Sequence, residues 1–529
     1  MKQKGWTRVR SNKNALIVLS LLVAAIALYT FGLGNSALRD WDEGIVAAVA
    51  RNIWRNFPQE TWLYPTIGDG QPYWNKPPLV HWGIAIAYSF WGVSEWSSRI
   101  VPTLLSALSV PVVYLIGREV LVAPIAPLFS SLVYLTLLPV ARHSRVAMLD
   151  GAISCWFCLA AWSLLRGRKQ PKWLLGTGLS LGLICLTKGM MMGLFLGGIL
   201  GLFILWDCPK LLLNRYLWIA LVLGVVPAIA WYGLQYLHYG QDFLGISLGK
   251  QTFNRIWEPL NPLNSPPWYY LLEILKYGFP WLIFLPQGVK LAWQQRNFSW
   301  AKLGLVWTGV YLLAISAMVT KLPWYLMPIY PGLSLLIGAS LAHSWHDQQF
   351  PPSWRISLSL LAGITLSGGL YLVLVAGLAT DLAIILGVAI ATLLWSAVFI
   401  WRSNRNFIVV LFGGFYLALL LLFNSSHWLW ELNEAFPVKP VAELIRQHAP
   451  PQQQIYTSYA YFRPSLDFYS DRVIIPASDL QLQQVWQQEN YPYLLLEPST
   501  IERLNLQSYQ VLGDVLNDVT WLLIMPADS

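Results

Sequence analysis

The residues best suited to chemistry begin with three carboxylates crowded beside an apolar run. The stretch RDWDEG places Asp40, Asp42 and Glu43 directly after the apolar run 14–34. Such acids are hydrated loop charges, metal ligands or a catalytic acid or base. Asp42 and Glu43 also open a segment with helical character, 43–56, and negative charge at a helix N-terminus is favoured by about 0.3–1 kcal/mol. Asp40 is interpreted as a loop charge, and the role of the other two depends on which residues share their side of the chain.

The composition of the chain indicates a membrane protein. Of 529 residues, 56% are hydrophobic and 12% are charged, and the mean hydropathy is +0.49. A soluble domain is about one quarter charged, so the missing charge is diagnostic. The net charge of +9 fits basic cytoplasmic loops. The sequence has no dense basic stripe of the kind that would indicate a nucleic-acid partner. Cys155 and Cys158 form a C-x-x-C inside an apolar run, where packing of small residues explains them.

About thirteen apolar runs are candidates to cross the bilayer on a ~20-residue criterion. They fall near 14–34, 97–117, 122–140, 146–165, 173–187, 190–206, 216–237, 269–289, 302–319, 324–342, 356–377, 382–401 and 406–425. The expected fold is therefore an all-α polytopic membrane protein in the bilayer of the plasma (bacterial inner) membrane.

The segment 77–92 decides the topology. If it does not cross and the N-terminus is cytoplasmic, nearly every basic loop falls inside, as the positive-inside rule requires. The inner segments are then 118–121, 166–172, 207–215, 290–302, 343–355 and 401–406. We therefore expect 77–92 to be an interfacial or re-entrant helix, anchored by Trp82, Trp91 and Trp96.

The composition changes again near residue 430. Strand-like runs alternate with helical segments at 438–448 and 478–489; the runs are QIYTSYA, RVIIPA, YLLLEP, YQVLGDV and TWLLIMP. We predict a membrane domain over 1–429, with 35–96 as its first extracytoplasmic loop, and an extracytoplasmic α/β domain over 430–529.

Several cations fall at span ends on the predicted outer face, where the topology rule disfavours them. These are Lys76, Lys188, Arg255 and Lys321. Together they predict a cationic cavity for an anion that the lipid phase delivers, and phosphate is the natural candidate. Tyr325 adds a hydroxyl donor nearby, and Asp150 begins a span on the same face.

A set of ordered motifs then gives the chain a family likeness. They are Asp42-Glu43, PYWNKPP (72–78), VAMLD (146–150), LTKG (186–189), PPWYYLLEILKYGFPWLIFLPQG (266–288) and KLPWY (321–325). With these motifs the chain resembles the polyprenyl-phosphate-sugar glycosyltransferases of the GT-C superfamily. The closest likeness is to the lipid A aminoarabinose transferase (ArnT-like) family, and the protein O-mannosyltransferases are more distant.

The resemblance implies transfer of a sugar, with inversion, from a polyprenyl-phosphate donor on the outer leaflet. It implies Asp42 at the reaction centre, with Glu43 beside it as a second catalytic candidate. It also implies donor or phosphate contacts from Lys76, Tyr73, Tyr325 and Arg255, the last at the family's spacing before Trp268. The ArnT-like branch carries Glu and often His, both associated with a metal, where this chain has Asn75 and Thr252. The expected metal ligands therefore do not match, and no metal-binding residue is predicted.

The predicted function is an inverting glycosyltransferase acting on a lipid, glycan or protein acceptor. A phosphate leaving group needs cations rather than a proton donor, and Asp42 suits a base if the acceptor is a hydroxyl. Two alternatives stay open: a lipid-linked sugar flippase or transporter, and a polymerase or ligase that uses polyprenyl-diphosphate oligosaccharides. A transporter should carry charges near the bilayer midplane and an internal repeat, and neither is evident.

Overall fold

A computed structural model gives the structure of residues 2–68, 70–258, 266–429, 438–451, 453–459, 462–488, 491–515 and 520–527, with the side chains of 2–12 and 252 excepted. The chain forms two compact units. The first comprises Met1–Leu33, Trp74–Val80 and Arg99–Trp428. The second comprises Gly34–Tyr73, His81–Ser98 and Leu429–Ser529.

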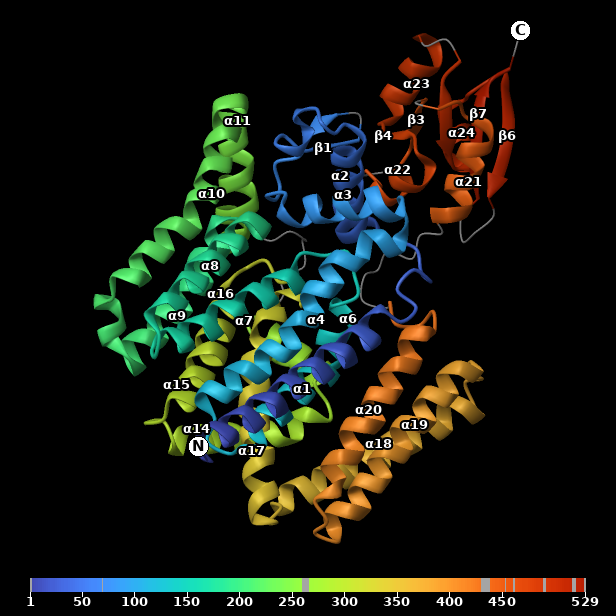
Figure 1. The fold of residues 1–529 in the computed structure, drawn as a ribbon. Coiled ribbons are helices and arrows are strands. Elements are labelled where there is room, and N and C mark those ends of the chain that lie inside the picture. The colour runs from blue at the N-terminus through green and yellow to red at the C-terminus, as the bar shows by residue number, and fades with distance from the viewer. Residues whose placement is uncertain are drawn as a thin grey trace. The chain divides into compact units, whose positions relative to one another are not determined.

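The first unit is a bundle of α-helices (Figure 1). Its helices are α1 (Lys2–Thr30), α4 (Glu95–Val120), α5 (Ala126–Thr136), α6 (Leu138–His143), α7 (Asp150–Gly167), α8 (Leu174–Lys188), α9 (Met190–Asp207), α10 (Arg215–Tyr239), α11 (Gln241–Leu244), α12 (Asn254–Trp257), α13 (Tyr269–Tyr277), α14 (Leu285–Gln294), α15 (Ser299–Leu305), α16 (Tyr311–Ala317), α17 (Tyr330–Asp347), α18 (Pro352–Leu374), α19 (Thr380–Trp401) and α20 (Asn406–Asn424). Shorter helical turns join them, among them the π-helical η5 (Gly245–Phe253) and η7 (Val306–Val310) and the 3₁₀-helical η6 (Trp281–Phe284) and η8 (Pro323–Ile329).

Within the described residues, nine helices are long and apolar enough to cross a membrane. The expectation of many apolar helices is confirmed, whereas the count of about thirteen spans stays a prediction. Two of the predicted runs are broken: 122–140 is divided between α5 and α6, and 269–289 between α13 and α14. Prolines explain both breaks, because Pro139 and Pro280 cannot donate a helical backbone hydrogen bond.

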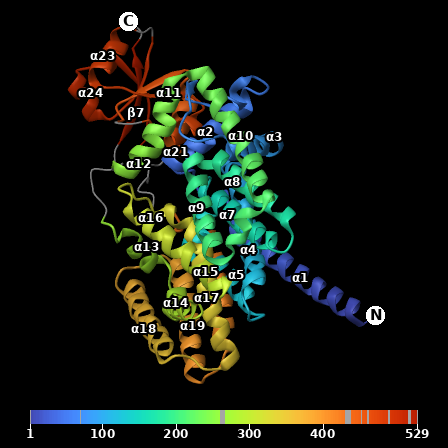
Figure 2. The same cartoon turned by 90° about the vertical axis from the view of Figure 1, so that its left-hand side faces the viewer.

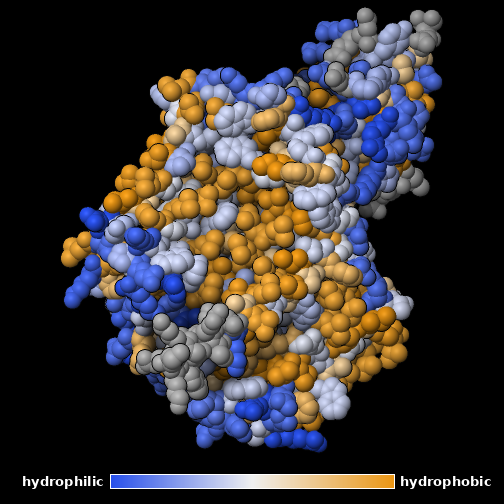
Figure 3. All heavy atoms as spheres, in the orientation of Figure 1, coloured by the Kyte–Doolittle hydropathy of each residue, from blue (hydrophilic) through white to orange (hydrophobic). Residues whose placement is uncertain are grey.

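The helices of the first unit differ in how much of their surface they bury. An 18-residue window within Pro323–Asp347 is buried throughout, whereas only 17% of such a window within Pro352–Leu374 is buried. An apolar helix that exposes most of its side chains needs an apolar solvent, which a bilayer supplies. Figure 3 shows the orange, apolar residues spread widely over the helical face turned to the viewer.

Small residues bring α8 and α10 unusually close. The two helices lie side by side in both ribbon views (Figures 1 and 2). A Cβ at Gly182 would lie 1.7 Å from the carbonyl oxygen of Gly224, and one at Gly178 would lie 1.8 Å from that of Ala220. The four-residue spacing on both helices is the small-xxx-small pattern that lets membrane helices approach closely.

The second unit contains a mixed five-stranded sheet with the order β4-β3-β5-β7-β6. Strand β3 is parallel to β4 and β5, whereas β7 is antiparallel to β5 and β6. The strands are β3 (Gln454–Thr457), β4 (Val473–Pro476), β5 (Tyr493–Leu496), β6 (Tyr509–Val515) and β7 (Trp521–Pro526). Each lies in one of the five predicted runs, so the predicted α/β fold of this region is confirmed.

Helices cover both faces of this sheet. Side chains of α21 (Val438–His448) and α22 (Pro464–Ser470) pack with one face, and those of α23 (Asp479–Gln488) and α24 (Pro498–Leu504) pack with the other. The central strand β5 reads YLLL and is buried on both sides, which is why it lacks polar alternation. Helices α21 and α23 match the predicted segments, whereas α22 and α24 are not predicted.

The same compact unit includes two helices from the first predicted loop, α2 (Ile45–Arg55) and α3 (Leu79–Trp91), and the two-residue strands β1 (Thr66–Ile67) and β2 (Gln71–Pro72). Helix α3 has 13 residues, well short of the ~20 that a span requires. Its placement at the membrane interface stays a prediction, as do the domain boundary at 429/430 and the side of the membrane.

Candidate functional site

Arg255 is the centre of a polar cluster in the first unit. It lies on α12, and its guanidinium donates two hydrogen bonds: Nη1 to the hydroxyl of Tyr325 (3.1 Å) and Nη2 to Oε1 of Gln251 (2.7 Å). The Nε atom of Arg255 is buried and has no hydrogen-bond partner among the described residues. A buried donor without a partner is costly in a folded protein, so this N–H is available to a ligand.

A buried ion pair between Lys188 and Asp150 lies near the ring of Tyr325. Lys188 ends α8 and Asp150 begins α7, and their Nζ and Oδ1 atoms are 2.5 Å apart. Both charges suit their places, because helix dipoles favour cations at C-termini and anions at N-termini. The Nζ of Lys188 also lies 5.1 Å from the centroid of the Tyr325 ring. Tyr325 therefore contacts both Arg255 and Lys188.

Lys76 belongs to the same electrostatic environment. It lies in the segment that joins β2 to α3, outside the candidate membrane spans. Burial lowers the pKa of Lys76 to about 7, with further lowering by Arg255 and Lys188 and an opposing effect of Asp150. Three cations thus act on one another beside a single carboxylate, an arrangement that favours an anion.

Gln251 also belongs to the cluster, although the sequence motifs do not include it. Gln251 donates a hydrogen bond from Nε2 to Oδ1 of Asn75 (3.1 Å) while it accepts one from Arg255. Gln251 lies within the π-helical segment η5, four residues before Arg255. The four-residue spacing from Arg255 was the one signal in the sequence that could have identified Gln251.

The structure shows other contacts for two of the predicted phosphate ligands. Lys321 donates from Nζ to the carbonyl oxygens of Ser316 (3.0 Å) and Met318, so it caps the end of α16. Tyr73 belongs to the second unit, is buried, and its ring lies 5.5 Å from that of His81. The roles assigned to both stay predictions.

The acids of the first loop also belong to the second unit. Asp42 and Glu43 lie on the π-helical turn η1 (Asp40–Gly44), which runs directly into α2, so their expected place before a helix is confirmed. Glu43 is buried and accepts a hydrogen bond from the backbone nitrogen of Arg39 (3.0 Å), whereas Asp42 is partly exposed. Glu43 therefore shapes the turn that presents Asp42.

The interpretation of Asp40 as a loop charge is wrong. Asp40 is 2% exposed and accepts hydrogen bonds from Nη1 of Arg463 (2.9 Å) and from the backbone nitrogen (3.0 Å) and hydroxyl (2.6 Å) of Ser465. The carboxylate thereby satisfies a free N–H at the start of α22. Gly44 is required in the same place, because a Cβ there would lie 2.8 Å from the nitrogen of Ser465.

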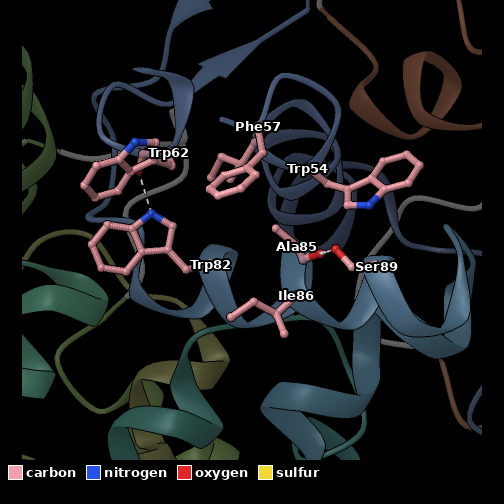
Figure 4. A pocket seen from close by; sticks show the side chains of 8 residues that line it. Trp54, Phe57, Trp62, Trp82, Ala85, Ile86 and Ser89 are labelled. Atoms are coloured by element: carbon pink, nitrogen blue, oxygen red, sulfur yellow. Dashed lines mark hydrogen bonds between the residues drawn. The ribbon is translucent and has the colours of Figure 1, made fainter. Parts of the chain in front are cut away.

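An apolar pocket of about 480 Å³ lies between α2 and α3 in the second unit (Figure 4). Its lining residues are Ile53, Trp54, Phe57, Trp62, Trp82, Ala85, Ile86 and Ser89. Figure 4 shows Trp62 and Trp82 together on one side, where the indole of Trp82 donates to the carbonyl of Trp62 (2.6 Å). Phe57 and Ile86 of this lining are 69% and 60% exposed, so the pocket wall presents apolar side chains to the surroundings.

Known proteins share this fold and parts of this sequence. Residues 17–240 match the family of dolichyl-phosphate-mannose-protein mannosyltransferases. The chain is 28% identical over 327 residues to an undecaprenyl phosphate-alpha-4-amino-4-deoxy-L-arabinose arabinosyl transferase of Pseudomonas fluorescens, covering 61% of this chain and 59% of that enzyme. The crystal structure of ArnT from Cupriavidus metallidurans bound to undecaprenyl phosphate superposes with a TM-score of 0.80 at 19% identity, covering 96% and 97% of the two chains. This chain has the fold of ArnT, and its sequence is similar to those mannosyltransferases and arabinosyl transferases. It is also a multi-pass membrane protein.

Two further matches are similar to this chain over most of its length. An uncharacterized protein of Aquifex aeolicus is 25% identical over 464 residues, which is 86% of this chain and 87% of that protein. The oligosaccharyltransferase of Archaeoglobus fulgidus has a TM-score of 0.56 at 12% identity, covering 92% of this chain and 69% of that one. At such identities the structural matches show the fold alone.

Asn75, one of the two residues at the expected metal position, does not suit a metal ion, because it is a neutral amide whose Oδ1 already accepts a hydrogen bond from Gln251. The Oε1 of Gln251, which is also a neutral amide, accepts a hydrogen bond from Arg255. Within the part of the chain that the structure describes, no three His, Cys, Asp or Glu side chains come together in a metal-binding group. The side chain of Thr252 lies outside the described residues.

Proposed function

We propose that the protein is an inverting glycosyltransferase that moves a sugar from a polyprenyl-phosphate-linked donor to an acceptor in the cell envelope. The observation that carries this proposal is the group of Lys76, Arg255 and Lys188 beside one carboxylate, with a buried Nε–H of Arg255 that lacks a partner. This is a site for a phosphate group. The relatives named above use or bind undecaprenyl phosphate, which supports a polyprenyl phosphate as its carrier.

The chemistry follows from the leaving group. When the bond between the sugar and the phosphate oxygen breaks, negative charge develops on the phosphate. Lys76 and Arg255 stabilise that charge, so no proton donor is needed. Tyr325 adds a hydroxyl contact and fixes the guanidinium through its hydrogen bond. Asp150 neutralises Lys188 in part and holds its ammonium in place.

The acceptor decides what Asp42 does. An attacking hydroxyl needs a base, and Asp42 has the partly exposed carboxylate for it, with Glu43 holding the turn. An attacking phosphate would need none. We assign the acceptor to the envelope lipids, glycans or proteins and the reaction to the extracytoplasmic face of the plasma membrane, in keeping with the distribution of loop charges.

A purified-enzyme assay tests the assignment of these residues. Transfer from a polyprenyl-phosphate sugar should fall by about 10²–10³-fold in Lys76→Ala, because a cation that stabilises the leaving group is lost. With a hydroxyl acceptor, Asp42→Asn should fall by about 10²–10⁴-fold. The exposed Lys290 and Asp242 provide matched controls, and Lys290→Ala and Asp242→Asn should keep wild-type rates. Full activity of Asp42→Asn with a hydroxyl acceptor would remove the base assignment.

Deletion of the gene identifies donor and acceptor together. Mass spectrometry of envelope lipids, glycoproteins and polysaccharides should show the loss of one hexose, pentose or amino-sugar increment. An unchanged envelope with accumulation of the lipid-linked sugar on the cytoplasmic side would instead indicate a flippase. The charges of the cluster stand at helix ends rather than in mid-span, which favours the transferase.

A further inference from the structure

Arg255 needs a fixed orientation if its free N–H is to meet a phosphate. Guanidinium groups bind phosphate through a planar fork, so affinity depends on the angle of the plane as well as on charge. Tyr325 and Gln251 each accept one hydrogen bond from the fork, at 3.1 Å and 2.7 Å. These two bonds hold the plane of the guanidinium and leave Nε for a ligand.

Gln251 is itself held by a second hydrogen bond, to a residue other than Arg255. Its Nε2 donates to Asn75, the neighbour in sequence of Lys76. The hydrogen bonds therefore run from Asn75 through Gln251 to Arg255 and Tyr325, and they join the Lys76 segment to α12 and to η8 (Pro323–Ile329). Both cations that contact the phosphate in the proposed function are thus linked through one amide side chain.

The amides also leave little reason for a metal at this position. A divalent cation prefers carboxylate or imidazole ligands, and here two neutral amides face a cluster of three positive side chains. A metal ion would add positive charge to an environment that already lowers the pKa of Lys76. A metal ion at this position would hold its ligands rigidly, and the amide of Gln251 holds Arg255 and Asn75 by hydrogen bonds instead.

We propose that Gln251, anchored by Asn75, is a positioning residue that holds Arg255 in the donor-phosphate site without a metal ion. The inference rests on the proposed function, because it assumes that Arg255 binds the donor phosphate. It adds Gln251, which the family motifs do not include, and gives a role to Asn75 of the PYWNKPP motif.

Binding of undecaprenyl phosphate to the purified full-length protein in detergent micelles tests this role. Gln251→Ala should weaken binding by about tenfold, since a hydrogen bond to a charged group is lost. Asn75→Ala should weaken it less, because the bond from Gln251 to Arg255 survives. Gln251→Met keeps the side-chain length without either hydrogen bond and should match Gln251→Ala. Gln241→Ala, an exposed glutamine on α11, is the control and should bind like the wild type.

A double-mutant cycle separates positioning from a general structural role. Arg255→Lys keeps the charge and loses the fork, so Gln251→Ala should have no further effect in that background. Chelation with EDTA should leave the affinity of the wild type unchanged. Additive losses in the double variant, wild-type affinity of both Gln251 variants, or a loss on chelation that added Zn²⁺ or Mg²⁺ restores would each overturn the inference.

The proposed function fails in a different way. If Arg255→Ala and Lys76→Ala both bind undecaprenyl phosphate like the wild type, the cluster is not the phosphate site. If those two variants lose affinity while the Gln251 variants keep it, the phosphate site stands and the positioning role is wrong.

Discussion

Lys76 has a positive charge in surroundings that make that charge costly. Burial is the largest cause, and the two neighbouring cations Arg255 and Lys188 add to it, so that its pKa lies near 7 rather than 10.5. A bound phosphate would oppose both effects, because an adjacent anion favours the charged ammonium. The residue is thus poised to be charged when the donor is present.

The low pKa of Lys76 in the empty site predicts a pH dependence of donor binding. Below pH 7 Lys76 is protonated in the empty site, and affinity for a polyprenyl phosphodiester should be constant. As the pH rises above 7, binding must first take up a proton, so affinity should fall by up to tenfold per unit until the pKa of the bound state is reached. The phosphodiester keeps its single charge throughout, which isolates the lysine. Titration between pH 6 and 9 measures the effect, and Lys76→Arg, which stays charged, should give a flat profile. A sloping profile for that variant would assign the titration to another group.

At the scale of elements, the position of Lys188 depends on how closely α8 and α10 pack. Lys188 is the last residue of α8, and six residues earlier Gly182 touches the backbone of α10. The glycines thus serve the site as well as the fold, because they set the depth at which α8 ends. The π-helical turn of Asp42 depends in the same way on Gly44.

Gly182→Leu should separate these helices. Its Cβ would meet the carbonyl oxygen of Gly224 at 1.7 Å, and backbone cannot yield as a flexible side chain does. We expect a melting temperature lower by about 5 °C or more, and weaker binding of undecaprenyl phosphate. Gly198→Leu on α9 is the control, since a Cβ there meets nothing within 4 Å. Equal stability of the two variants would show that the contact between α8 and α10 is not needed.

At the scale of the whole molecule, the loop charges predict that the C-terminus lies outside and the loop 166–172 inside. Cysteine labelling with a membrane-impermeant maleimide tests this in a Cys208→Ser background, because Cys155, Cys158 and Cys185 are buried. Exposed Gln507 and Gln170 supply the two sites. Gln507→Cys should react in spheroplasts, and Gln170→Cys should react after the membrane is opened. The reverse pattern would invert the topology.

The sequence by itself determined the features that follow from local pattern. Apolar runs separated by basic loops indicated a polytopic membrane protein, because burial in lipid demands length and apolarity that one segment shows alone. The five strands near the C-terminus were predicted because a short strand-like run is also visible in one segment alone. The motifs that contain Lys76 and Tyr325, with Arg255 at the family's spacing before Trp268, indicated the enzyme class, and the fold agrees with it.

The tertiary structure alone decided which side chains meet. Asn75 and Gln251 are 176 residues apart, and Asp40 and Ser465 are 425 apart. No local pattern encodes such pairs, because they depend on where packed helices bring their ends and on which buried donors still need acceptors. This is why Asp40 was misread as a loop charge and why Gln251 was missed beside the arginine it holds.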